Sequence, residues 1–513
     1  MVRLLAACLG LAALSLLLPS ELSYDPVAWV LWGREIVHLQ LDTSGGPSWK
    51  PLSVMFTTLV APLGEFDRGL PSALWMVVAR AGTLLALAMT VRLVFRLSGG
   101  GAAGAFGGAV AVVAVCLTPD WFQFAAHGSE APLAVAFMLW AFERHLDGRP
   151  GHALALGTLA CLLRPELVPF LGLYGLWAWV TQPHLRPALA AVAVLLPAAW
   201  VVPEWIGSGN PLDGGKQARS EPVWSLSLAE RPWMRALERI HNHSGLVVEL
   251  LTAVAVSVAL ARRRRAVLVL AGAALAEASL YVAMTQAGFS GNPRYVLPAL
   301  ALACVLAGVG AADVLNVAQG LARRLARAPR SGSLAGGSLA GARLAGVAGA
   351  AVGVAAVGLL GASFVDARTK RLEHEVRQVG IRMKIHRDLG RAVARLGGPR
   401  AVAVLGPATA NRALHSRIAW ELGVPMGAVE SIADYRVVFR SDREQLVGNV
   451  YLRGKAHSRQ TLDRVGSFWV YRRDGVTLPN GERKLEAIGS PFTSLLQGFD
   501  TSRPQAGKSS DGG

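Results

Sequence analysis

Charged residues are scarce in this chain of 513 residues. They make up 17% of the sequence, against 52% hydrophobic residues, and the mean hydropathy is +0.39. Soluble globular proteins carry about a quarter charged residues, so the composition excludes an ordinary soluble protein. It also excludes a disordered chain, which needs low hydrophobicity. The composition favours one large membrane domain with a smaller additional part.

Cysteine is rarer still, and acidic residues are outnumbered by basic ones. The four cysteines all lie within apolar runs, so neither a disulfide framework nor a zinc framework is visible. Lysine and arginine number 51 against 34 acidic residues, which gives a net charge of +17. In a soluble protein this excess would indicate nucleic-acid binding, whereas in a membrane protein it marks cytoplasmic loops. The positions of the basic residues decide between the two.

A signal-peptidase cleavage pattern is missing after the first apolar run, Leu4 to Pro19, which follows Arg3. We therefore predict a retained membrane helix with a cytoplasmic N-terminus. A spanning helix needs about 20 mostly apolar residues. The further apolar runs are 71–96, 102–118, 130–146, 186–202, 245–261, 266–286, 295–318 and 342–364.

The stretch 152–180 is interrupted by Arg164-Pro165-Glu166 and by Pro169, and forms either one helix or a hairpin of two short helices. Short loops rich in Lys and Arg stay cytoplasmic. With a hairpin, all five basic clusters fall on the side of Arg3, whereas a single span moves 262–265 outside. We therefore predict a hairpin, about eleven transmembrane spans, and a multi-pass cell-membrane protein without a nucleic-acid partner. The clusters are Arg92/Arg96, Arg144 to Arg149, His184/Arg186, Arg262 to Arg265 and Arg323 to Arg330.

The domain organisation follows from this topology. A transmembrane domain is predicted over 1–365, and its first outer loop, 20–70, holds two amphipathic stretches that suit interfacial helices. A change to charged and alternating patterns predicts a small extracytoplasmic α/β domain over 366–499. Residues 500–513 have the composition of a disordered tail. Helices are expected at Lys370 to Arg395 and Asn411 to Leu422, and strands at Ala401–Leu405, Tyr435–Arg440 and Phe468–Tyr471.

Several polar residues lie on the predicted outer side. Asp25, in Tyr24-Asp25-Pro26, either presents a carboxylate at the membrane surface or belongs to a helix-ending Asp-Pro turn. Lys50 either binds an anion or anchors Trp49-Lys50 at the interface. His127 and Glu130 end the second outer loop, where Glu130 could also cap a helix.

The remaining candidates come from later loops. Arg164 and Glu166 form either a ligand-binding pair or a local ion pair of the hairpin turn, and Arg294-Tyr295 end the last short outer loop. Taken together, these carboxylates and cations suit a reaction on an anionic lipid-linked substrate. The cations would bind phosphate, and a carboxylate would take a proton from an incoming hydroxyl.

Three other features have simpler explanations. The glycines of 99–104 match a dinucleotide-binding pattern, but no strand precedes them, and Gly100, Gly104 and Gly108 suit close helix packing. His241-Asn242-His243 is a weak metal pair. Arg80 and Glu277 lie within spans, where charged residues usually face a cavity or a partner.

The polar segments resemble those of the GT-C superfamily of polytopic glycosyltransferases, which includes protein mannosyltransferases and lipid A aminoarabinose transferases. The resemblance covers about 1–365 and departs from the family at Pro26, where a second acidic residue often follows the first. Metal use therefore stays open: no metal ligands are assigned, and a divalent ion is possible. The matching segments are Tyr24-Asp25-Pro26, Trp49-Lys50-Pro51-Leu52, Leu163-Arg164-Pro165-Glu166 and Asn292 to Pro298.

The resemblance implies a GT-C-like fold and a sugar transfer with inversion from a polyprenyl-phosphate-linked donor. The acceptor would be an extracytoplasmic glycan, lipid or protein. The implied catalytic residues are Asp25, as the general base, and Glu130. The implied substrate-binding residues are Lys50, Arg164 and Arg294 at the leaving phosphate, together with His127, Glu166 and Tyr295.

Two other functions stay open at this point. One is a transporter or flippase of lipid-linked sugars, which would need polar residues near the bilayer midplane and usually internal repeats. The sequence shows no such repeat. The other is a GT-C-like scaffold that binds these lipids without chemistry.

Overall fold

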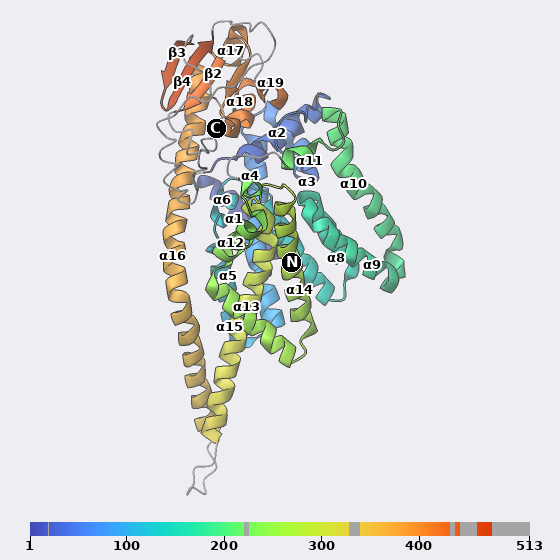
Figure 1. Ribbon diagram of the computed structural model, residues 1–513, viewed down its shortest axis with the longest axis vertical. Helices are drawn as coiled ribbons and strands as arrows, with labels where there is room; N and C mark the ends of the chain where they lie inside the picture. The colour runs from blue at the N-terminus through green and yellow to red at the C-terminus, as the bar shows by residue number, and fades with distance from the viewer. Residues whose placement is uncertain (19, 220–224, 328–338, 431–436, 442–458, 474–513) are drawn as a thin grey trace, which may run out of the picture.

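Apolar helices form most of the molecule, and a small sheet lies at one end (Figure 1). The computed structural model describes residues 1–513 except 19, 220–224, 328–338, 431–436, 442–458 and 474–513. The predicted tail, 500–513, lies outside the described residues.

Helices make up most of residues 1–208. They are α1 (Val2–Leu14), α2 (Tyr24–Val37), α3 (Pro51–Val60), α4 (Leu70–Leu97), α5 (Gly101–Cys116), α6 (Trp121–Ala126), α7 (Ala131–Leu146), α8 (Pro150–Leu163), α9 (Val168–Thr181) and α10 (Arg186–Ser208). Short 3-10 turns join some of them, namely η1 (Ser15–Leu17), η2 (Ala61–Glu65), η3 (Pro165–Leu167) and η4 (Pro183–Leu185).

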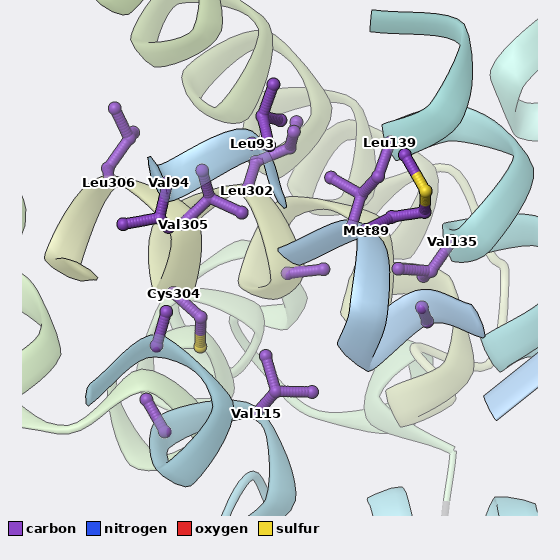
Figure 2. Packing of buried hydrophobic residues seen from close by; sticks show 14 of the residues in the cluster. Met89, Leu93, Val94, Val115, Val135, Leu139, Leu302, Cys304, Val305 and Leu306 are labelled. Carbon is purple, nitrogen blue, oxygen red and sulfur yellow. The ribbon is translucent and has the colours of Figure 1, made fainter. Parts of the chain in front are cut away.

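The bundle continues beyond α10. Its further elements are α11 (Asp213–Ala218), η5 (Leu226–Leu228), α12 (Pro232–Ser244), α13 (Leu246–Ala261), α14 (Arg265–Gln286) and α15 (Pro293–Arg327). Helix α15 is the centre of the bundle, because its apolar window is 94% buried and α4, α5, α7, α13 and α14 pack against it. Figure 2 shows this core, where Leu302 and Val305 of α15 lie beside Leu93 and Val94 of α4.

Five of the described helices are long and apolar enough to cross a membrane, and a sixth span results if the bent pair α12–α13 counts as one. The chain is therefore a multi-pass membrane protein. The expected eleven spans are not matched by this criterion, since α5 has 16 residues, α7 has 16 and α8 has 14, below the roughly 20 that a straight span needs. The number eleven stays a prediction.

Glycines allow the closest helix contacts. A Cβ atom on Gly107 of α5 would collide with the carbonyl oxygen of Gly308 of α15. On the neighbouring face of α5, Gly104 and Gly108 approach Phe95 and Val91 of α4. The packing interpretation of this glycine-rich run is thus confirmed for Gly104 and Gly108.

The stretch 152–180 forms two helices, α8 and α9, joined by the turn Arg164 to Leu167.

Three of the predicted basic clusters lie close together in the structure. Arg96 pairs with Asp147, and Arg264 donates a hydrogen bond of 2.5 Å to the carbonyl oxygen of Leu97. Three of the five predicted clusters therefore share one end of the bundle, as the hairpin interpretation requires.

Helix α16 (Leu339–Arg395) runs along the bundle to the sheet (Figure 1). Its 57 residues rise about 85 Å at 1.5 Å per residue, well beyond a hydrocarbon core of about 30 Å. The predicted span 342–364 and the predicted helix 370–395 are thus parts of one continuous helix.

The part after α16 holds a four-stranded sheet in the order β1-β2-β4-β3, with β1 parallel to β2 and the other pairs antiparallel. Its elements are α17 (Pro399–Leu405), β1 (Ala408–Ala410), α18 (His415–Leu422), α19 (Met426–Glu430), β2 (Val437–Ser441), β3 (Arg459–Val465) and β4 (Phe468–Arg473). The strand predicted at 401–405 is wrong, since α17 occupies it. Pro399 favours a helix start, and short apolar runs do not distinguish helix from strand.

The first loop and the C-terminal part share one hydrophobic core. Trp29 and Trp32 of α2 belong to the same cluster as Ile418 of α18, Phe439 of β2 and Phe468 of β4. Helix α2 is therefore covered by protein, although its sequence suits an interfacial helix. Helix α3 keeps an apolar exposed side, with Met55 and Leu59.

Candidate functional site

Asp25 and Arg294 form an ion pair between the start of α2 and the start of α15. Asp25 lies in the first turn of α2, where the helix dipole favours a carboxylate. It begins a helix, so the interpretation as a helix-ending turn is wrong. Both side chains keep a little exposure, 16% for Asp25 and 19% for Arg294. A ligand can therefore reach this pair.

Arg164 is the centre of a buried ionic group. Its Nη1 donates a hydrogen bond of 3.0 Å to Oε1 of Glu130, and its Nη2 donates one of 2.8 Å to the carbonyl oxygen of Arg294. It also pairs with Glu166, and its guanidinium lies 5.1 Å from the ring centre of Tyr295. Arg164 and Glu130 are fully buried. The α8–α9 turn is thereby fixed to the starts of α7 and α15.

Lys50 caps α3 ahead of Pro51 and is 2% exposed. Its Nζ lies 5.3 Å from the ring centre of Trp200 in α10. Burial and the charge of Arg164, opposed by the charge of Glu130, together lower the pKa of Lys50 to about 8. Among the described residues, Lys50 has no carboxylate within 4 Å and no side-chain hydrogen bond.

The charges of Glu130 and Glu166 act on Lys50 from beyond 4 Å, and a buried cation without a direct partner is costly. The neighbouring Arg294 also has a buried Nε without a hydrogen-bond partner among the described residues. Buried donors of this kind usually have a partner. An anionic ligand would provide one for both cations.

The loop that carries Lys50 is held from α10. Oε1 of Glu204 accepts a hydrogen bond of 3.0 Å from the backbone N–H of Trp49, and Nε1 of Trp49 donates one of 3.1 Å to the carbonyl oxygen of Ala199. Sequence reasoning missed Trp200 and Glu204. The available signal was an acidic residue at the end of a predicted span, where it usually has a partner.

His127 lies apart from this group. Its Nδ1 is 3.0 Å from the carbonyl oxygen of Glu21, and Arg382 and His386 of α16 are close to it. Burial, aided by the charge of Arg382, lowers the pKa of His127 to about 4. The structure therefore brings together seven of the eight predicted site residues and directs His127 toward α16.

The other charged candidates have partners or line a cavity. Nη1 of Arg80 donates a hydrogen bond of 2.7 Å to the carbonyl oxygen of Ser15. Glu277 lines a mainly apolar cavity of about 220 Å³ between α7, α8, α9, α14 and α15. His243 contacts Asp120 and the backbone of its own helix. No three His, Cys, Asp or Glu side chains of the described residues gather as a metal site.

Comparison with known proteins gives a match at the level of fold. No family profile matches the chain, and no curated protein is significantly similar in sequence. Among solved structures, ArnT from Cupriavidus metallidurans in the apo state has a TM-score of 0.51 and 15% identity. The match covers 92% of this chain and 97% of ArnT. The chain thus has the fold of ArnT, an aminoarabinose transferase of the GT-C family.

Proposed function

We propose that this protein is a GT-C-type membrane glycosyltransferase that moves a sugar from a polyprenyl-phosphate-linked donor to an extracytoplasmic acceptor. The observation that carries the proposal is Lys50, a buried cation with no carboxylate within 4 Å among the described residues, beside the Asp25–Arg294 pair. A phosphate group supplies the missing charge, and a nearby carboxylate supplies the base.

In the proposed reaction, the acceptor hydroxyl attacks the anomeric carbon while the bond from that carbon to the phosphate oxygen breaks. Asp25 takes the hydroxyl proton. The leaving prenyl phosphate gains one negative charge, which Lys50 and Arg294 stabilise. Because Arg294 contacts Asp25 before the donor binds, a phosphate that attracts Arg294 would also release the Asp25 carboxylate from this ion pair.

Arg164 and Glu130 receive a supporting role in this proposal. The sequence suggested Arg164 for the phosphate and Glu130 for catalysis. In the structure Nη1 and Nη2 of Arg164 contact Glu130, Glu166 and the Arg294 carbonyl, and its buried Nε has no hydrogen-bond partner among the described residues. Oε2 of Glu130 accepts a hydrogen bond of 3.1 Å from Ser129. We assign both to holding the start of α15, and with it Arg294, in place.

The outer position of the site and of the C-terminal part belongs to the proposal as well. The sheet and its helices pack against α2, which carries Asp25. An acceptor would therefore bind between this C-terminal α/β part and the membrane domain.

Donor binding and donor consumption separate the candidate functions. The full-length protein in sealed liposomes is given a radiolabelled polyprenyl-phosphate-linked sugar, and bound donor, released prenyl phosphate, transferred sugar and donor moved between the leaflets are measured. We expect Lys50→Gln to lose donor binding and Asp25→Asn to keep it without turnover. Asp42→Asn is the matched control. Asp42 lies in the same loop, and its Oδ1 accepts a hydrogen bond of 2.9 Å from the backbone N–H of Ser44. Donor that stays bound but intact in the wild type would identify a scaffold, and donor moved across the bilayer intact a flippase.

A further inference from the structure

A second cationic site lies between the first loop and the C-terminal part. Arg34 of α2 and Arg68, just before α4, both lie over the ring of Trp420 in α18, at 5.8 and 5.5 Å from its centre. They line a pocket of about 130 Å³ together with His38, Glu65 and Pro71. None of these residues takes part in the sugar-transfer site.

The two guanidinium groups have few partners. Arg68 donates a hydrogen bond of 2.6 Å to the carbonyl oxygen of Trp420, and Arg34 donates one of 3.4 Å to that of Val424. Each guanidinium has five N–H donors, so most of them are unused by the described residues. The two groups are also close enough to repel each other.

Among the described residues, no carboxylate lies within 4 Å of either guanidinium group. Glu65 lines the pocket, yet it forms no ion pair within 4 Å with a described residue. Burial lowers the pKa of Arg34 and the charge of Glu35 opposes this from a distance, while Oε2 of Glu35 accepts a hydrogen bond of 3.1 Å from the backbone N–H of Asp42. Two guanidinium groups without a carboxylate partner form a site for an anion, and arginine is the residue best suited to phosphate.

The surroundings of the pocket indicate where this anion comes from. Exposed apolar side chains flank it: Leu39 is 93% exposed, Leu59 80% and Phe66 87%. Arg68 precedes α4, one of the membrane-crossing candidates, by two residues. Apolar side chains that enter the acyl region beside arginines at headgroup depth are typical of a bilayer-binding surface.

We propose that Arg34, Arg68 and Trp420 form a binding site for the phosphate of an anionic bilayer phospholipid. The site joins the first loop to α18, so a bound lipid would hold the C-terminal part against the membrane domain. This inference does not rest on sugar transfer and is tested without it.

The experiment compares lipid retention by native mass spectrometry. Full-length protein is titrated with phosphatidylglycerol, phosphatidylcholine, glycerol phosphate or a phosphorylated glycolipid. We expect phosphatidylglycerol to bind about tenfold more tightly than phosphatidylcholine, because both lipids offer phosphodiester oxygens but the choline cation of phosphatidylcholine repels the two guanidinium groups. The double variant Arg34→Gln/Arg68→Gln should lose this preference, and Arg34→Lys/Arg68→Lys should keep part of it.

The control is Arg149→Gln/Arg186→Gln, which removes two charges elsewhere, including an arginine 5.6 Å from the ring centre of Trp179. It should retain the preference. The proposal is overturned if the control loses the preference for phosphatidylglycerol as much as the glutamine variant does, or if the glutamine variant keeps the wild-type preference. It is also overturned if glycerol phosphate binds as tightly as phosphatidylglycerol, or if only the glycolipid binds. If the glutamine variant does not fold, the wild type decides: phosphatidylglycerol must raise its unfolding temperature above that in phosphatidylcholine.

Discussion

At the scale of single residues, Asp25 offers the sharpest test. Asp25→Asn keeps the shape of the side chain and its place in the first turn of α2, but removes the basicity. A general base contributes about 10²–10⁴-fold to rate, so we expect turnover to fall by that factor while donor binding and folding persist. The measurement is single-turnover sugar transfer by purified protein. Near-wild-type turnover would make Asp25 a structural partner of Arg294 and move the base to Glu35 or Glu130.

The lowered pKa of Lys50 predicts that kcat/KM for the donor depends on pH. Burial lowers its pKa from 10.5 to about 8, so the free enzyme loses this cation as the pH rises through about 8. We expect kcat/KM for the donor, which reports the free enzyme, to decline above that pH. Lys50→Arg should abolish the decline, because arginine stays charged. The same inflection in both proteins would show that another group titrates.

At the scale of elements, the α8–α9 turn depends on Arg164. Removing one member of a buried ionic group costs about 3–5 kcal/mol, because the remaining charges lose their partner. We expect Arg164→Leu to lower the free energy of unfolding by this amount without donor present, measured by denaturant unfolding in detergent. Arg149→Leu, at an exposed site, is the control and should change it by about 0.5 kcal/mol or less. Unchanged stability together with lost donor binding would instead identify Arg164 as a residue that binds the donor phosphate.

The contact of α5 with α15 gives a second prediction at this scale. Gly107→Ala places a methyl group against the carbonyl of Gly308, so the helices must move apart and the unfolding temperature should fall. Gly272→Ala in α14 is the matched control, since nothing lies within 4 Å of its new Cβ. That change should be neutral or stabilising by up to about 1 kcal/mol. Equal effects at both positions would contradict close packing at Gly107.

The sequence was informative where one physical signal dominated. Apolar length located α4, α14 and α15, and charge parity chose the hairpin of α8 and α9. It failed where signals compete or are non-local. The run 401–405 suits helix and strand equally, and the structure makes it α17. Trp200 and Glu204 contact Lys50 and Trp49 from about 150 residues away, and no local pattern contains that contact.

At the scale of the whole molecule, α16 joins the membrane bundle to the sheet as one helix. The Arg382 and His386 neighbours of His127 lie on this helix, and Glu21 pairs with Arg417 of α18 at 2.5 Å. The first loop, α16 and α18 are therefore linked by charged contacts as well as by a shared core. Movement of the C-terminal part would thus act directly on the segment that carries Asp25.

Topology is the last prediction, and the bent pair α12–α13 makes it decisive. If this pair crosses the membrane as one broken span, Lys216 in α11 and Arg262 after α13 lie on opposite sides; if it is re-entrant, they lie on the same side. The α13–α14 turn lies at the basic end of the bundle, because Arg264 contacts Leu97 and the nearby Arg96 pairs with Asp147. The charge rule predicts that this end is cytoplasmic. In a cysteine-free background, we therefore expect an impermeant maleimide to label Lys216→Cys in intact cells. Arg262→Cys and the control Arg149→Cys should react only after permeabilisation. Labelling of Arg262→Cys in intact cells would make α12–α13 re-entrant and remove the charge argument for an outer site.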